Sequence, residues 1–156
     1  DAGTDDAREI VLDWLRADPG TFVYVGHGSL PLLGDEKILT MEDAGGWEGP
    51  TVVAAWSCLC ANFTHPGYTG LAETWLQADQ GVVAFVGPTG ETTTSEQYAM
   101  AMALQRALAE GATLGDAMML AWRESRSADA QQSFLLLGDP ALQPMPASPE
   151  MERGDG

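Results

Sequence analysis

Two kinds of side chain in this 156-residue chain can together open an acyl group, a cysteine thiol and a histidine imidazole. The chain holds two cysteines, Cys58 and Cys60, and two histidines, His27 and His65. A thiol attacks a carbonyl carbon as the thiolate, and a nearby imidazole can take its proton or hold an ion pair with it. The elements around these residues decide which cysteine and which histidine the fold brings together.

His27 and Cys58 each follow a run of residues that predicts a buried strand. Residues 21–25 (TFVYV) and 51–57 (TVVAAWS) are rich in β-branched and aromatic side chains, which favour strands. Further strands are expected over 82–86 and 133–137. Amphipathic spacing and capping residues predict helices over 5–16, 69–79, 95–110 and 114–126. Residues 30–50 are expected to be mostly loop, with one helical turn near 41–44.

Apolar strands that alternate with helices predict an α/β fold, with a mostly parallel sheet and helices on both faces. In such sheets chemistry gathers in the loops that follow the carboxyl ends of the strands. If the first two strands are neighbours, His27 and Cys58 face one cleft. The backbone N–H groups of Gly28 and Cys58 are then candidate donors to the oxyanion that thiolate attack creates.

Simpler interpretations of the same residues stay open. A cysteine at a strand end is commonly a small buried hydrophobe, and a histidine beside glycine is commonly a turn residue. Cys58, Cys60 and His65 also suggest a metal site, although their spacing is not the standard Cys-x₂-Cys and no fourth ligand is evident. Cysteines at i and i+2 on a strand point to opposite sides, so no disulfide is expected. We expect Cys60 to be structural and His65 to be an exposed loop residue.

The charge of the chain excludes several classes of protein. Seven Lys and Arg against 23 Asp and Glu give a net charge of −16, and Lys37 is the only lysine. Neutralising phosphates requires clustered Lys and Arg, so we expect neither nucleic-acid binding nor docking on anionic membranes. No apolar run approaches the roughly 20 residues of a membrane span, and no signal peptide is recognised.

Four segments together resemble the catalytic half of the gingipain-type cysteine peptidases. They are residues 24–29 (YVGHGS), Ser57-Cys58 followed by Phe63, residues 81–87 (GVVAFVG) and residues 136–140 (LLGDP). The resemblance covers roughly residues 8–143, and it implies the caspase-like three-layer sandwich. It also implies a cysteine endopeptidase in which Cys58 and His27 form a catalytic dyad and Gly28 belongs to the oxyanion hole. The distance to Phe63 assigns the nucleophile to Cys58 rather than to Cys60.

The resemblance also suggests how substrate is held. A peptide or protein substrate is implied, with no cofactor; whether a structural calcium is bound cannot be read from the sequence. We expect the loop after the third strand to form one wall of the substrate pocket, with Gly87, Pro88, Thr89 and Glu91 as binding residues. Glu91 and the general acidity suit a basic side chain before the scissile bond. The simpler interpretation, that Glu91 is a solvated loop charge, stays open.

The family carries further strands before the histidine strand, whereas only one helix precedes it here. We therefore expect the sheet to be incomplete at its N-terminal edge, to be completed by an N-terminal half or by a second chain. Residues 1–145 are expected to form the peptidase domain and 146–156 a disordered tail. A bacterial source is implied, with secretion and a cytoplasmic location both open. A catalytically inactive scaffold is the main alternative, and another thiol hydrolase or acyltransferase is a third.

Overall fold

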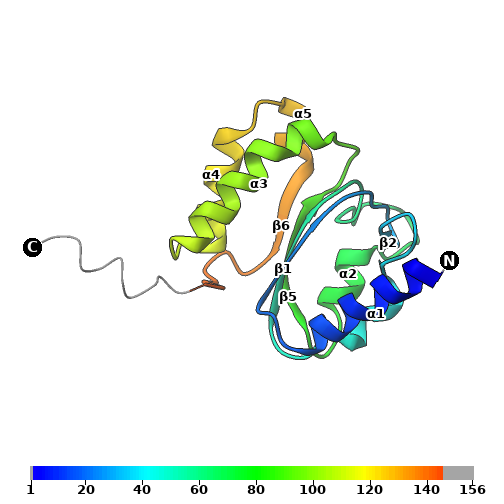
Figure 1. Ribbon diagram of the computed structural model, residues 1–156. Helices are drawn as coiled ribbons and strands as arrows, with labels where there is room; N and C mark the ends of the chain where they lie inside the picture. Colours follow the sequence, from blue (N-terminus) through cyan, green and yellow to red (C-terminus); the bar gives the residue numbers. More distant parts are fainter. Residues whose placement is uncertain (1, 146–156) are drawn as a thin grey trace, which may run out of the picture.

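The computed structural model describes residues 2–145, with side chains from Asp5, and its centre is a four-stranded sheet (Figure 1). The strand order is β1 (Thr21–Val25), β4 (Thr51–Trp56), β5 (Val82–Pro88) and β6 (Phe134–Gly138). The first three run parallel, and β6 is antiparallel to β5. The expected α/β fold with a mostly parallel sheet is confirmed.

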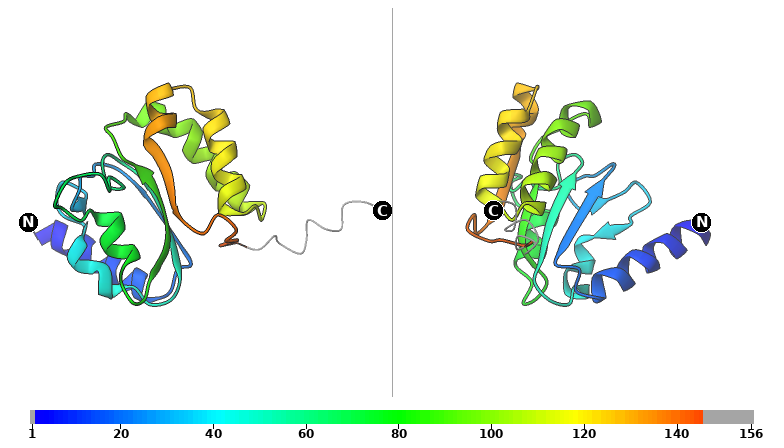
Figure 2. Two further views of the ribbon diagram at one scale, coloured as in Figure 1. Left: turned by 180° about the vertical axis from the view of Figure 1, so that it is seen from behind. Right: turned by 60° about the vertical axis from the view of Figure 1, so that its left-hand side comes forward.

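Helices cover both faces of this sheet (Figures 1 and 2). One face carries α1 (Ala2–Arg16), the 3₁₀ helix η1 (Met41–Gly46) and α2 (Leu71–Leu76), and the other carries α3 (Thr94–Ala109) and α4 (Leu114–Glu124). A short helix, α5 (Ala128–Ser133), leads into β6. Trp47 and Trp75 lie in the core on the first face, whereas Trp56, Met100 and Met118 lie in the core on the second. The molecule is thus the predicted three-layer sandwich.

The helix expected over residues 5–16 is present, and its apolar spacing indicates the core face only in part. That spacing places Ile10, Val11, Trp14 and Leu15 on one face with Ala7. Val11 and Leu15 do pack into the core, whereas Ile10 and Trp14 are 69% and 46% exposed and Leu12 is buried instead. Arg8 lies on the same face as these two leucines, and its ion pair with Asp43 fixes the rotation of the helix. A charged contact across 35 residues cannot be found from apolar spacing.

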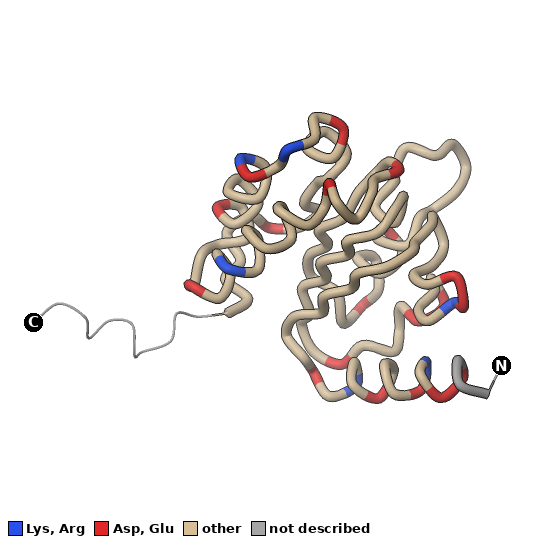
Figure 3. The backbone as a smooth tube through the Cα atoms, turned by 45° about the horizontal axis from the view of Figure 1, so that its top comes forward, with Lys and Arg blue, Asp and Glu red and all other residues tan. Residues whose placement is uncertain are grey.

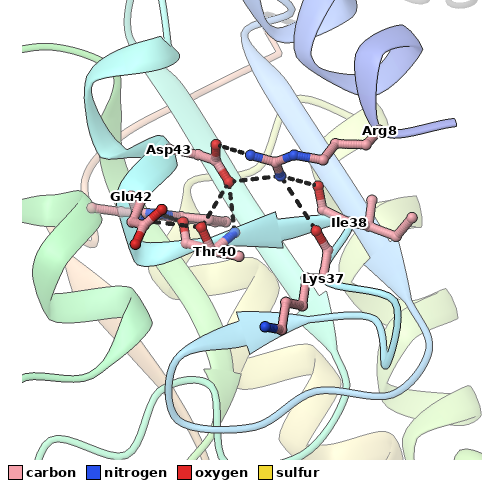
Figure 4. A network of polar contacts seen from close by, with 7 residues as sticks. Arg8, Lys37, Ile38, Thr40, Glu42 and Asp43 are labelled. Atoms are coloured by element: carbon pink, nitrogen blue, oxygen red, sulfur yellow. Dashed lines mark hydrogen bonds and ion pairs between the residues drawn. The ribbon is translucent and has the colours of Figure 1, made fainter. Parts of the chain in front are cut away.

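Arg8 connects α1 to the segment that follows the first strand (Figure 4). Its guanidinium donates to both carboxylate oxygens of Asp43 at 2.6 and 3.0 Å and to the Ile38 carbonyl at 2.8 Å. Burial alone would raise the pKa of Asp43, but the hydrogen bonds from Arg8 and Thr40 outweigh it and hold that pKa below its ordinary value. The carboxylate therefore stays ionised.

The segment between β1 and β4 is more ordered than predicted. The expected helical turn is present as η1, capped by Thr40. The hairpin of β2 (Leu32–Leu33) and β3 (Leu39–Thr40) was not predicted, because two-residue strands are too short to give an alternating pattern. This hairpin packs beside the loop that carries His27, through a bridge between Gly28 and Leu33.

The first strand is not buried on both sides as expected. It forms one edge of the sheet, and the side chains of Val23 and Val25 are 43% and 62% exposed. The hydrogen bonds from the Gly26 N–H to the Trp56 carbonyl and from the Val52 N–H to the Gly20 carbonyl turn the even-numbered residues of the strand toward β4. The backbone groups of Val23 and Val25 therefore point away from the sheet. This agrees with the expected incomplete edge.

Other boundaries differ by a few residues. The third strand extends to Pro88, and the helix expected over 69–79 is limited to α2. After β6 the chain turns at Asp139-Pro140, with the Ala141 N–H donating to Asp139 Oδ1 at 2.8 Å. Within residues 2–145, no helix is both long and apolar enough to cross a membrane. The tail predicted over 146–156 lies outside the described residues.

Candidate active site

The pairing of β1 with β4 brings the His27 and Cys58 segments together. Val25 lies opposite Trp56 in the parallel register, and the Gly26 N–H donates to the Trp56 carbonyl at 3.1 Å. His27 and Cys58 each stand two residues beyond this matched pair. The two backbone segments therefore leave the sheet side by side at its carboxyl edge, as the sequence predicted.

The backbone of His27 is held from two directions. Its carbonyl accepts from the Tyr24 hydroxyl and from the Gly34 N–H, each at 2.8 Å. Burial first, and then the charges of Glu36 and Asp35, raise the pKa of Tyr24, so the phenol remains a donor. The His27 side chain itself is exposed. The peptide is thus fixed while the imidazole is accessible.

Gly28 lies directly against the turn that follows β4. In its antiparallel bridge with Leu33 the two hydrogen bonds use the His27 carbonyl and the Ser29 N–H, so the Gly28 N–H points away from Leu33. A methyl group at Gly28 would lie 2.7 Å from Ser57 Oγ. A side chain cannot be accommodated there without movement, and only glycine permits this approach.

The Cys58 thiol is partly buried and contacts the loop before α3. Its Sγ donates to the Thr92 carbonyl at 3.3 Å, and the Thr92 N–H approaches Sγ at 3.5 Å. In the described chain no hydrogen bond joins this thiol to the His27 imidazole. Leu59 follows with φ = +59°, a left-handed conformation that turns the backbone sharply after Cys58.

Cys60 has the structural role that the sequence predicted. It is fully buried, it accepts a hydrogen bond from Ser57 Oγ at 3.1 Å, and burial raises its pKa to about 12. His65 is exposed, with its ring edge-on to Tyr68. Among the described residues no group of three potential ligands is placed to hold a metal ion, so the Cys58–Cys60–His65 interpretation finds no support.

A cavity of about 470 Å³ opens beside the Cys58 thiol. Its lining comes from the His27–Gly28 loop, the turn after β4, the loop before α3 and the start of α5: Gly28, Cys58, Leu59, Glu91, Thr92, Thr93, Glu96 and Asp129. Gly28 and Cys58 thus share one concave surface. Among the described residues, no Lys or Arg lines it.

Of the four residues predicted as the substrate wall, only Glu91 lines this cavity. Gly87 and Pro88 are buried within β5, where they pair with β6, because the strand extends two residues beyond its apolar run. The Thr89 hydroxyl donates to the Ser133 carbonyl at 3.1 Å and faces α5 rather than the cavity. The loop that lines the cavity is therefore 91–93.

Five lining residues were not predicted as site residues: Leu59, Thr92, Thr93, Glu96 and Asp129. The sequence indicated only that Thr92 and Thr93 precede and cap the helix expected over 95–110. Hydrogen bonds from Ser127 and then from Thr93 lower the pKa of Glu96, so its carboxylate stays ionised. Figure 3 shows acidic residues spread over the described part of the chain and basic residues at few places. The lining of this cavity is therefore acidic, as is the protein as a whole.

The fold and the site define the class of this protein, an α/β protein of the caspase-like type that carries a cysteine at the carboxyl edge of its sheet. The profile described as Peptidase family C25 matches residues 1–145. The chain therefore belongs to this family of cysteine peptidases.

Solved structures resemble the chain in fold. The crystal structure of the Arg-specific cysteine proteinase gingipain R matches with a TM-score of 0.71 at 18% identity, covering 87% of this chain and 36% of that chain. The complex of pro- and mature domains of RgpB from Porphyromonas gingivalis matches at 0.76 and 17%, with the same coverage. A third structure, described as a protease, matches at 0.74 and 14%, covering 87% of this chain and 38% of that one. The chain thus spans little more than a third of these structures, and no curated protein matches it.

Proposed function

We propose that this chain carries the catalytic dyad of a cysteine endopeptidase, with Cys58 as nucleophile and His27 as general base and then general acid. The observation that carries the proposal is the parallel register of β1 and β4, which brings both residues to one edge of the sheet. Family membership supports a peptidase over a non-catalytic scaffold. Cys60 is unsuited to the role because it is fully buried and its pKa is raised to about 12.

The reaction follows from these two side chains. The Cys58 proton passes to His27, and the thiolate attacks the carbonyl carbon of the scissile peptide bond. When the tetrahedral intermediate collapses, the C–N bond breaks and the amine leaves with the proton from His27. His27 then takes a proton from water, which attacks the acyl-enzyme; the acid product leaves and the Cys58 thiol is regenerated. No cofactor is required by this sequence of steps.

The backbone N–H groups of Gly28 and Cys58 are the proposed oxyanion donors. The Gly28 N–H points away from its hairpin partner, and Gly28 lines the same cavity as the thiol. In residues 2–145 neither N–H is occupied by another hydrogen bond. Fixed donors of this kind, at the place where negative charge develops, contribute about 3 kcal/mol each in comparable sites.

We propose that a basic side chain precedes the scissile bond, by analogy with gingipain R, which is Arg-specific. The carboxylates of Glu91, Glu96 and Asp129 line the cavity beside Cys58. Glu91 and Asp129 are exposed, so each contributes modestly and in a salt-dependent way. Glu96 is oriented by hydrogen bonds from the Ser127 and Thr93 hydroxyls.

We further propose that a segment outside these 156 residues, an N-terminal half or a second chain, pairs with β1. Beside this edge lies an apolar groove of about 300 Å³ that includes Val23, Val25, Tyr98 and Met102. Tyr98 and Met102 are 66% and 46% exposed, which is unusual for side chains that sit together. Amide exchange at Val23 and Val25 should be fast in the 156-residue chain and slow in the complete peptidase; equal rates would contradict this pairing.

Hydrolysis of fluorogenic peptides tests the proposed function. Cys58→Ala should abolish cleavage, whereas Cys60→Ala should retain it in proportion to the folded protein. The same substrates offered as esters separate a peptidase from another thiol hydrolase, because a peptidase cleaves the amide as well. Activity that survives in Cys58→Ala and disappears in a folded Cys60→Ala would overturn the assignment.

A further inference from the structure

Gln97 is a buried amide behind the Cys58 loop, and the mechanism above does not use it. It lies in the first turn of α3, faces β4, and is 4% exposed. Its Nε2 donates to the Ser57 carbonyl at 2.8 Å and to the Thr92 hydroxyl at 2.6 Å. The Thr92 hydroxyl in turn donates to the Ser57 carbonyl at 3.1 Å. These three groups form a closed triangle.

The triangle joins the two segments that hold the thiol. Ser57 is the residue before Cys58 and is itself buried. The backbone carbonyl and N–H of Thr92 are the groups that contact Cys58 Sγ, at 3.3 and 3.5 Å. Gln97 is not hydrogen-bonded to the sulfur and does not itself line the cavity. Its influence on the thiol must therefore pass through Ser57 and Thr92.

Burying the Gln97 amide costs free energy, and its hydrogen bonds offset that cost. The neighbouring residues on the same face of α3, Met100 and Leu104, are apolar and fully buried. A buried amide in such surroundings is unfavourable unless it is hydrogen-bonded. The Ser57 carbonyl lies beyond the last paired residue of β4, so the sheet offers it no donor, and Gln97 and Thr92 supply two.

We propose that Gln97, acting through the Thr92 hydroxyl and the Ser57 carbonyl, is a positioning residue that fixes Cys58 Sγ for proton transfer to His27. This inference rests on the proposed function of Cys58. If the triangle is lost, the Ser57–Cys58 peptide and the Thr92 loop move independently, and the thiol leaves its productive alignment. A displacement of this kind, of about 1 Å, can cost up to about 100-fold in rate.

Two variants separate positioning from simple stabilisation. Gln97→Met keeps the length of the side chain and removes both donated hydrogen bonds, and Gln77→Met, at the exposed end of α2, is its control. We expect Gln97→Met to lower kcat by about tenfold to 100-fold with KM within about twofold, and to slow alkylation of Cys58 by iodoacetamide by about tenfold. Gln77→Met should change neither quantity. Both are measured where the variants are fully folded.

Thr92 gives an independent test that does not require the Gln97 variant to fold. Thr92→Val removes the hydroxyl and should reproduce both losses, whereas Thr92→Ser restores the hydroxyl and should restore both rates. Unchanged or faster alkylation of Cys58 in folded Gln97→Met, or in folded Thr92→Val, would overturn the inference. The alkylation assay reports on Cys58 without a peptide substrate. It therefore tests the role of Gln97 separately from the proposed function, which fails if Cys58→Ala retains peptidase activity.

Discussion

Gly28 and Ser57 pack against each other between the two loops of the candidate active site. A methyl group on Gly28 would lie 2.7 Å from Ser57 Oγ and 2.8 Å from Ser57 Cβ. The first residue follows His27, and the second precedes Cys58. The spacing of the two catalytic candidates therefore depends on one glycine without a side chain. The same Ser57 hydroxyl donates to Cys60 Sγ, so it cannot easily move aside.

Gly28→Ala should therefore push the two loops apart. Overpacking of a tight contact costs about 1–3 kcal/mol, and we expect the free energy of unfolding to fall by that amount. Because the contact separates His27 from Cys58, kcat/KM should fall by at least about tenfold in the folded fraction. Gly45→Ala is the control, since nothing lies within 4 Å of a methyl group there. Full activity in Gly28→Ala would contradict the close packing of the loops.

Asp43→Asn should destabilise the protein by about 2 kcal/mol near neutral pH, because it removes the ionised partner of Arg8. The folded-state pKa of Asp43 lies below its ordinary value, so this stabilisation is present above the ordinary pKa and is lost as the pH falls through the folded value. Urea unfolding at a series of pH values measures both effects.

The control for this prediction is the exposed pair of Asp13 and Arg16 on the same helix, joined at 2.6 Å. Because both side chains are largely in solvent, Asp13→Asn should cost less than about 0.5 kcal/mol. The acid sensitivity of the wild type should be reduced in Asp43→Asn and retained in Asp13→Asn. Equal losses of unfolding free energy in the two variants would mean that the Arg8–Asp43 ion pair contributes no more than the exposed Asp13–Arg16 pair.

Glu96→Gln should reduce the preference for a positively charged side chain before the scissile bond. Peptides that differ only in arginine or its neutral isostere citrulline isolate the charge, and we expect the ratio of their kcat/KM values to fall about threefold to tenfold. Glu110→Gln, at the far end of α3, should leave the ratio unchanged. If the wild type already cleaves the two peptides with a kcat/KM ratio near one, the proposal that a basic side chain precedes the scissile bond is wrong.

Two buried tryptophans should respond differently to replacement by phenylalanine. Trp75 Nε1 donates to the Thr40 carbonyl at 3.0 Å, whereas Trp56 Nε1 is buried without a hydrogen-bond partner in the described chain. Trp75→Phe loses volume and a hydrogen bond and leaves the partly buried Thr40 carbonyl with one donor fewer. Its cost in the free energy of unfolding should exceed that of Trp56→Phe by about 1 kcal/mol. Urea unfolding of both variants gives the comparison.

The four main strands, and the residues that follow the first two of them, could be predicted because their signals are local. The runs before His27 and Cys58 are apolar and β-branched, and the glycines beside His27 end the first strand abruptly. Once the two strands are neighbours, as the structure shows, their parallel packing brings the two ends together. These inferences need only neighbouring residues and one rule of sheet topology.

The parts that were missed depend on distant contacts. Gln97 has the sequence of a helical surface residue, and its burial follows from a carbonyl 40 residues earlier in the chain. Gly87 and Pro88 favour a loop locally, but pairing with β6 keeps them in the sheet. The core face of α1 was predicted only in part, because Arg8 pairs with Asp43, 35 residues later. Local propensity gives way to tertiary contacts in each case.

The most direct test of the central claim is the site and rate of labelling by a peptidyl chloromethyl ketone with arginine next to the reactive group. Peptide mapping by mass spectrometry should find the adduct on Cys58 alone, and His27→Gln should slow its formation by about 100-fold or more. An adduct on Cys60, or labelling of Cys58 at the same rate with and without His27, would contradict the Cys58–His27 dyad.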